Sequence, residues 1–244
     1  MNKLIPNLSV DCVVFGFDKQ NLNVLLKKRQ LKSAETGEML VDDYTLTGYH
    51  VFEGEDLDTA AQRTLYNVTG LKDIYLEQFF TFGNTDRLTA ETDKNWINSL
   101  DFEIAEHVIS VGYLALVDST KVKPDSEHPE VFWMPVSNLP ALGFDHKNIL
   151  DKALERLRMK VRLEPIGFEL LPDKFTLREM QEMYECILGI TFDKRNFRKK
   201  VSQMKYVIQL DEKQHGVAHK PAQKFIFSRD VYDRTRTEKL NLFI

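Results

Sequence analysis

The chain has 244 residues, of which 43% are hydrophobic and 29% charged, the proportions of an ordinary globular protein in water. No apolar run approaches the roughly 20 residues that cross a bilayer, and the segment MNKLIPNLSV lacks the apolar core of a secretory signal. These features exclude a membrane-spanning protein, and we expect a cytoplasmic one. Cys12 and Cys186 are far apart and form no metal-spaced set, so we expect reduced thiols, no metal and no cofactor.

Charge is distributed unevenly along the chain. Residues 1–150 carry 13 Lys and Arg against 23 Asp and Glu, a net charge of −10, whereas residues 151–244 carry 20 against 14, a net charge of +6. Such an imbalance predicts two domains, here residues 1–160 and 161–244, and makes the basic one a candidate for binding nucleic acid. A solvated basic face would give the same count, so charge alone leaves both interpretations open.

The acidic part has the pattern of a layered domain of strands and helices. Strands are predicted where β-branched and aromatic residues gather, at 9–17, 23–29, 75–82, 108–117 and 131–135. Leu57–Thr69 is predicted to be a helix, because its apolar residues recur on one face and Gly70 can end it. A second helix is predicted at Asn148–Leu157. Strands that flank helices favour packed layers around one core.

The segment Leu46–Leu71, LTGYHVFEGEDLDTAAQRTLYNVTGL, resembles the Nudix box. That pattern is G-x5-E-x7-R-E-U-x-E-E-x-G-U, in which U is a bulky apolar residue. When the segment is aligned on Arg63 and Gly70, the first glutamate of the pattern falls on Glu55. The resemblance implies that Arg63 ties the box together by ion pairing, with Glu55 as its partner.

The other acidic positions of the box are lost. Its glycine is Tyr49 here, and its three helix glutamates are Thr64, Asn67 and Val68. In the family those glutamates share one helix face and converge on Mg²⁺, a hard cation that requires anionic oxygens. A threonine, an asparagine and a valine cannot supply them. The resemblance therefore implies a Nudix-like domain that binds a ligand without hydrolysing it.

A polar small-molecule pocket is predicted around the box. Tyr49 places a ring where the parent fold leaves room for a diphosphate, which favours a smaller ligand. The insertion at residues 88–106, which contains Trp96 and Phe102, is predicted to form a loop or a short helix that helps to close the pocket. The candidate effector-binding residues combine aromatic faces with hydroxyl or amide groups; they are Tyr44, Thr47, Tyr49, His50, Phe82 and Asn84.

The basic part contains two consecutive helix starts. Thr176 and Glu179 have the spacing of a capping box, and Gly189 can end the helix that they begin. Asp193 can then cap a second helix over Lys194–Met204. Two short helices joined by a tight turn match a helix-turn-helix, whose second helix enters the major groove of DNA.

The second helix carries its positive charge on the outer face, because Phe197, Val201 and Met204 occupy the inner one. Residues 205–210 and 223–227 are predicted to be two strands of a wing around a polar loop. The candidate DNA-binding residues lie on this helix and in this wing: Lys194, Arg195, Asn196, Arg198, Lys199, Ser202, Lys213, His219 and Lys220. A small helical subdomain with a solvated basic face is the alternative interpretation of the segment.

Two further segments, FTLREMQEMYECILGITFDKRNFRKK and HKPAQKFIF, resemble the winged helix of Nudix-related transcriptional regulators. YLEQFFTFGNTDR and HVISVGYLALV resemble parts of the Nudix domains in that family, so the resemblance covers nearly the whole chain. It implies an α+β fold, in which a Nudix-like α/β/α sandwich precedes a winged helix-turn-helix domain. It also implies a homodimer that binds palindromic operators on double-stranded DNA.

Some members of the family respond to ADP-ribose-type nucleotides, and another branch responds to pentose sugars. Tyr49 and the lost acidic residues place this chain nearer to the pentose branch, with L-arabinose as the expected effector. The leading hypothesis is therefore a ligand-responsive regulator of sugar catabolism that is not an enzyme. Arg195 and Asn196 are expected to read guanine and adenine edges, while Lys194, Arg198 and Lys199 hold phosphates.

Two alternatives stay open. A divergent Nudix hydrolase of ADP-ribose or a related nucleoside diphosphate would recruit its metal through carboxylates outside the box, for which Asp42, Asp43 and Glu53 are the candidates. A sensor that acts through a protein partner would use the winged helix to bind protein. Mg²⁺-dependent hydrolysis of ADP-ribose or a nucleoside diphosphate would favour the hydrolase. Binding that polyanionic competitors leave unchanged would favour the sensor that acts through a protein partner.

Overall fold

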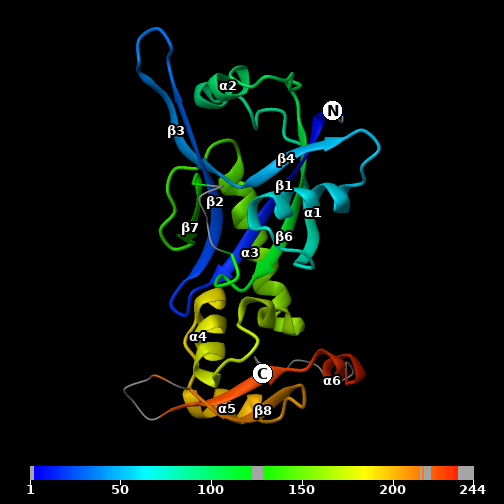
Figure 1. Ribbon diagram of the computed structural model, residues 1–244, viewed down its shortest axis with the longest axis vertical. Coiled ribbons are helices and arrows are strands. Elements are labelled where there is room, and N and C mark those ends of the chain that lie inside the picture. The colour runs from blue at the N-terminus through cyan, green and yellow to red at the C-terminus, as the bar shows by residue number, and fades with distance from the viewer. Residues whose placement is uncertain (1–2, 123–128, 215, 217–220, 236–244) are drawn as a thin grey trace.

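The N-terminal sheet and the C-terminal winged helix lie end to end along the long axis of the molecule (Figure 1). The structure is a computed structural model that describes residues 3–122, 129–214, 216 and 221–235. In these ranges no helix combines the length and the apolar character that a membrane crossing requires.

A seven-stranded mixed sheet forms the N-terminal part. Its central strand β1 (Leu4–Phe17) pairs antiparallel with β2 (Leu22–Lys32) and β4 (Thr47–Phe52). It pairs in parallel with β6 (Ile109–Val117). The remaining strands extend the sheet on both sides; they are β3 (Met39–Thr45), β5 (Tyr75–Phe82) and β7 (Val131–Pro135).

The sheet is covered by helices on both faces, because successive side chains of β1 point to opposite sides. On one side lies α1 (Leu57–Thr69), and the cluster there includes Val10, Cys12, Val14, Ala60, Ala61 and Leu65. On the other lies α3 (His146–Leu163), and the cluster there includes Val13, Phe15, Phe17, Ile149, Ala153 and Leu157. The expected α/β/α sandwich is confirmed.

The strands and helices predicted for this part all form; α1, β5 and β7 have the predicted ends, whereas the ends of β1, β2, β6 and α3 differ. The structure adds β3 and β4. Neither strand was predicted, because its alternation is broken by polar residues whose partners are distant in sequence. Asp43 of β3, for example, binds Arg29 of β2. The insertion forms the short helix α2 (Glu91–Asn98), as predicted. Gly70 ends α1 in the left-handed conformation, with φ of 67°.

Local capping defines the helix-turn-helix. At the start of α4 (Leu177–Leu188) the Thr176 hydroxyl accepts the Glu179 N–H at 3.1 Å, and the Glu179 carboxylate accepts the Thr176 N–H at 2.7 Å. Gly189 ends the helix in the left-handed conformation, with φ of 66°. Asp193 accepts the Asn196 N–H at 2.9 Å and begins α5 (Lys194–Val201). Both starts are confirmed, although α5 ends at Val201 and not at Met204 as predicted.

The wing follows as an antiparallel pair of strands, β8 (Val207–Lys213) and β9 (Gln223–Phe227). A last helix, α6 (Arg229–Arg234), was not predicted. The two parts are joined through α3 and the 3₁₀ turn η1 (Pro165–Leu170), so the predicted boundary at residue 160 falls inside α3.

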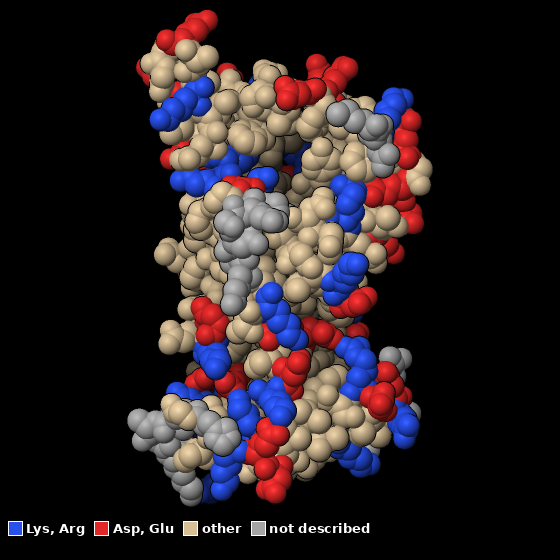
Figure 2. Space-filling view, viewed as in Figure 1, with Lys and Arg blue, Asp and Glu red and all other residues tan. Residues whose placement is uncertain are grey.

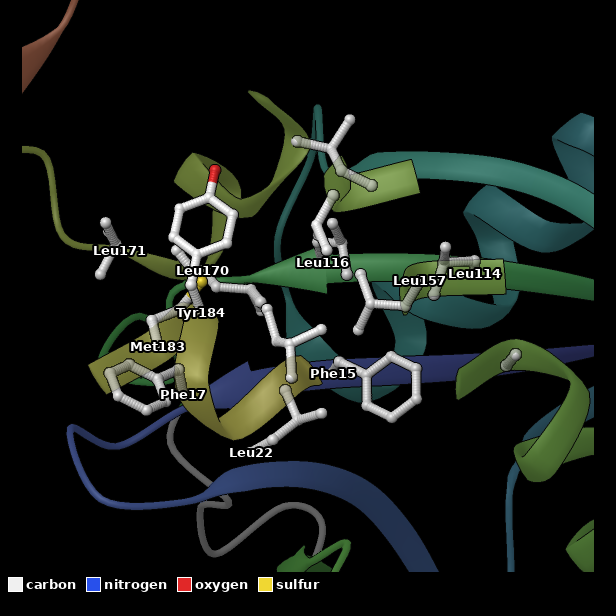
Figure 3. Close-up of a cluster of buried hydrophobic side chains, with 14 of the residues drawn as sticks. Phe15, Phe17, Leu22, Leu114, Leu116, Leu157, Leu170, Leu171, Met183 and Tyr184 are labelled. Carbon is white, nitrogen blue, oxygen red and sulfur yellow. The ribbon is translucent and has the colours of Figure 1, made fainter. Parts of the chain in front are cut away.

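The two parts share one hydrophobic core. Figure 3 shows Phe17 of β1 beside Met183 of α4, with Leu170 and Leu171 next to them. Met183 and Tyr184 are fully buried. Because complete burial of a large apolar side chain contributes about 1.5–3 kcal/mol, this contact fastens α4 firmly to the sheet.

The turn between β1 and β2 also reaches the winged helix (Figure 1). Lys19 adopts a left-handed backbone, with φ of 79°, and its Nζ lies 3.1 Å from Oε1 of Glu179. The carbonyl of Gln20 accepts the thiol of Cys186 at 3.2 Å. The turn of the β1–β2 hairpin therefore contacts α4 both near its start and near its end.

Candidate functional site

A cavity of about 600 Å³ lies at the sheet end of the molecule. Its wall is formed by β1, β2, β4 and α1, together with α2 and the segments beside it. Figure 2 shows the upper face hollowed in this region, with basic side chains at the back. The insertion helps to close the cavity, as predicted; it contributes Leu88, Trp96, Ile97, Leu100, Phe102 and Ile104.

Three of the six predicted effector-binding residues line this cavity: Thr47, Tyr49 and His50, all on β4. The other three are not part of its wall, and their place in an effector site stays a prediction. Phe82 is 4% exposed and belongs to the core, where it contacts Phe79. Tyr44 packs its ring on Phe132, and Asn84 is exposed beyond the end of β5. Neither residue is part of the cavity wall.

Four buried titratable residues of the cavity wall were not predicted from the sequence: Asp11, Arg29, Arg87 and His146. All four are less than 10% exposed. One signal was present, because Asp11 interrupts the apolar strand SVDCVVFGF and a buried carboxylate requires partners. The partners themselves come from remote segments, so the sequence did not indicate them.

Arg29 fastens α2 to the sheet. Its Nε lies 2.7 Å from Oδ1 of Asp43, and its Nη2 lies 2.8 Å from Oδ1 of Asp93 on α2. The guanidinium also stacks on the ring of Phe144, 4.1 Å from the centroid. Burial lowers the pKa of Arg29, but the hydrogen bonds to the two carboxylates outweigh it and raise that pKa. A Cβ on Gly143 would collide with the guanidinium, so the close approach requires glycine there.

Arg63 and Glu55 form the ion pair that the resemblance implied. Arg63 Nε donates to Glu55 Oε1 at 2.7 Å, and Arg63 Nη2 donates to Glu55 Oε2 at 2.8 Å. Arg63 Nη2 also donates to the carbonyl of His50 at 3.0 Å. The hydrogen bond from Arg63 lowers the pKa of Glu55. The retained glutamate of the box is therefore engaged in holding α1 to β4.

A third buried cluster surrounds Asp11. Arg87 donates to Asp145 at 2.7 Å, and its Nη2 lies 3.6 Å from Oδ2 of Asp11. Ser110 donates to the same Oδ2. Nε2 of His146 lies 3.5 Å from the other oxygen of Asp11, Oδ1. This polar cluster therefore holds a carboxylate at the wall of the cavity.

The residues present do not fit the Mg²⁺ site of a Nudix hydrolase. Thr64 donates its hydroxyl to the carbonyl of Ala60 at 2.8 Å, and neither Asn67 nor Val68 is anionic. The described residues include no group of three or more His, Cys, Asp or Glu that could hold a metal ion. The carboxylates considered as replacements have other partners: Asp42 binds Gln30, Asp43 binds Arg29, and Glu53 binds Lys3.

The basic face of α5 lies at the opposite end of the molecule, where Lys and Arg are numerous among acidic side chains (Figure 2). Phe197 and Val201 are 3% and 2% exposed, which turns the other side of the helix outward. Six predicted DNA-binding residues are exposed there: Lys194, Arg195, Asn196, Arg198, Lys199 and Ser202. Lys213 is exposed at the end of β8, and His219 and Lys220 lie outside the described residues.

Two family models match the chain in succession. The model described as "NUDIX domain" matches residues 6–156, and the model described as "NrtR DNA-binding winged helix domain" matches residues 167–227. The chain is similar to a protein of Acinetobacter baylyi described as an ADPR responsive transcriptional repressor. The two are 28% identical over 231 residues, covering 93% of this chain and 84% of the relative.

Solved structures agree with these matches. Shewanella oneidensis NrtR complexed with a 27mer DNA is 26% identical, with a TM-score of 0.73, covering 93% of this chain and 95% of that one. A MutT/nudix family protein from Enterococcus faecalis is 23% identical, with a TM-score of 0.64, covering 92% and 87%. The second likeness supports the fold alone.

Proposed function

We infer the function from the premise that the chain belongs to the Nudix domain family, among the NrtR-type regulators that join this domain to a winged helix. It is a DNA-binding transcriptional regulator with a Nudix-like ligand-binding domain. Two observations support the more detailed proposals. In the cavity, the catalytic carboxylates of the Nudix box are replaced, whereas on α5 exposed cations surround a buried apolar stripe.

We propose that α5 reads the operator. Arg195 and Asn196, in its first turn, supply bidentate contacts to guanine and adenine edges in the major groove. Lys194, Arg198 and Lys199 hold phosphates and give an affinity that falls steeply with salt. The protein acts as a homodimer on a palindromic operator, because two copies related by a two-fold axis match two half-sites.

The Nudix-like domain is proposed to sense and not to hydrolyse. The positions of the metal-binding glutamates carry Thr64, Asn67 and Val68, and the nearby carboxylates Asp43 and Glu55 are engaged in ion pairs. An effector in the cavity changes DNA affinity only to the extent that it binds one arrangement of the protein better than another.

Two effectors have specific support. ADP-ribose is favoured by the description of the Acinetobacter relative and by a cavity of about 600 Å³, which exceeds the needs of a monosaccharide. None of the relatives reported above is described as responding to a sugar, so they give no support to L-arabinose or to control of sugar catabolism. L-arabinose is favoured by charge: the arginines Arg29, Arg63 and Arg87 are all paired with carboxylates. We propose the uncharged pentose first and ADP-ribose second.

DNA binding and effector response are tested together. Duplexes selected from a random-sequence library are titrated with the protein at several salt concentrations, with and without L-arabinose or ADP-ribose. We expect an enriched palindrome whose affinity falls with salt and changes with one of the two ligands. The matched control is Lys147→Ala, which removes an exposed lysine of α3 far from the recognition helix. A selection that enriches no sequence would overturn the proposed function.

A further inference from the structure

Asp11 is a buried carboxylate of the cavity wall whose two oxygens have different neighbours. It lies on β1, lines the cavity and is only 5% exposed. Its Oδ2 accepts the Ser110 hydroxyl and lies 3.6 Å from Arg87 Nη2. The neighbour of Oδ1 is His146 Nε2 at 3.5 Å, which is longer than the roughly 2.7–3.2 Å of an ordinary N–H···O bond.

His146 presents a donor beside this acceptor. Its Nδ1 accepts the N–H of Leu46 at 2.9 Å, and a ring nitrogen that accepts a hydrogen bond carries no hydrogen itself. The proton of the neutral ring is therefore on Nε2, the atom that faces Asp11 Oδ1. His146 also lines the cavity and is 5% exposed. An acceptor and a donor thus lie side by side at one point of the wall.

The carboxylate is ionised. Burial raises the pKa of Asp11, but its contacts with His146, with the Arg87 guanidinium and with the Ser110 hydroxyl outweigh burial and lower that pKa. A fixed negative charge repels a phosphate and attracts hydroxyl hydrogens. Gly48 on the neighbouring strand makes room for this group, because a Cβ there would collide with Asp11 Oδ1.

A hydroxyl group matches this pair of atoms, since it donates one hydrogen bond and accepts others. We propose that Asp11 and His146 form the subsite that reads the ring hydroxyls of a pentose, either free or as the ribose of a nucleotide. A hydroxyl there donates to Asp11 Oδ1 and accepts from His146 Nε2. Tyr49, Trp96 and Phe102, in the same cavity, supply apolar faces for the carbons of the ring. The inference rests on the proposed function only in requiring an effector in this cavity.

The test compares wild type, Asp11→Asn and the control Gln62→Ala, which changes an exposed residue of α1 outside the cavity wall. Binding of L-arabinose and of ADP-ribose is measured by titration calorimetry. Loss of a hydrogen bond to a charged group predicts roughly 10- to 100-fold weaker binding in Asp11→Asn and less than about 3-fold in Gln62→Ala. Which of the two ligands binds wild type distinguishes the free pentose from the nucleotide.

A second measurement does not depend on the folding of a variant. Deoxy analogues that lack one ring hydroxyl are titrated into wild type. We expect one of them to bind more weakly than the parent ligand, by the same factor by which Asp11→Asn weakens binding of the parent ligand. That analogue should bind Asp11→Asn no worse than the parent ligand does. Equal binding of every deoxy analogue, or no binding of either ligand to wild type, would overturn the pentose subsite. Loss of sequence-specific DNA binding would overturn the proposed function instead, so the two failures are distinct.

Discussion

The cavity and the recognition helix both contain several cations, but they hold them differently. Each arginine of the cavity is paired with carboxylates from another element, as Arg29 is with Asp43 and Asp93. On α5 the side chains of Lys194, Arg195, Arg198 and Lys199 are exposed, and within the described parts of the chain they form no ion pair. The paired arginines stabilise the wall of the cavity, whereas the cations of α5 are available to an anionic partner such as DNA.

The difference has a thermodynamic meaning. A buried pair must keep both partners, since removing one leaves an uncompensated charge in a region of low dielectric. An exposed lysine or arginine contributes little to stability and can be removed without harm to the fold. Substitutions in the two regions should therefore separate effects on folding from effects on DNA binding.

The largest effect is expected at Arg29. Arg29→Met leaves Asp43 and Asp93 without their shared partner and should lower the free energy of unfolding by about 3–5 kcal/mol. Urea unfolding measures it. The control is Lys28→Met, which removes a partly exposed pair with Asp42 and should cost less than about 1 kcal/mol. Equal losses in the two variants would contradict the assigned role of Arg29.

Glu179 is the next test, because it is a paired charge within the winged helix itself. Glu179→Ala removes the capping-box acceptor for the Thr176 N–H and the partner of Lys19, and should cost about 1–3 kcal/mol of unfolding free energy. Glu182→Ala, which loses only a pair with the exposed Arg178 on the same helix, serves as the control. If only Glu182→Ala lowered the free energy of unfolding, the expected difference between buried and exposed ion pairs would be wrong.

Arg195 should show the reverse behaviour. Arg195→Ala is expected to weaken operator binding by about 1–3 kcal/mol and to relax the preference at one base position. Its unfolding free energy should stay within about 0.5 kcal/mol of wild type, because the side chain is exposed. Fluorescence anisotropy with the selected palindrome and with single-base variants measures the first effect. Unchanged base preference would remove Arg195 from the reading face.

The smallest effect is expected at Lys199. Lys199→Ala should weaken binding to all duplexes about equally and reduce the slope of log affinity against log salt by about 1. Anisotropy titrations at four salt concentrations give the slope. If the variant changed sequence preference and left the slope unaltered, Lys199 would be a base contact and not a phosphate contact.

The winged helix was largely predictable because its signals are local. The capping box at Thr176, the αL stop at Gly189 and the N-cap at Asp193 all involve residues a few positions apart. The shortened end of α5 was not predictable in the same way. Met204 continues the apolar spacing, but the chain leaves the helix after Val201 to enter the wing.

The cavity was only partly predictable because its contacts are long-range. Arg29 meets Asp93 across 64 positions, and the Leu46 N–H meets His146 across 100. The Nudix-box resemblance located β4 and α1 and the pair of Arg63 with Glu55, since these lie within the motif. It gave no information on the polar cluster around Asp11, whose members come from β1, β6, the segment before α2 and the first residue of α3.

The contact between the β1–β2 turn and α4 has a mechanical consequence. Glu179 lies between Lys19 of that turn and Lys224 of β9, at 3.1 and 3.5 Å, so the sheet, the first helix and the wing meet at one carboxylate. Bending the subunit at this point would separate charges and open the core beneath Met183. Each subunit should therefore move as one rigid body. In the proposed dimer, on an operator with half-sites about 34–36 Å apart, the spacing of the two α5 helices would change by rotation of whole subunits against each other.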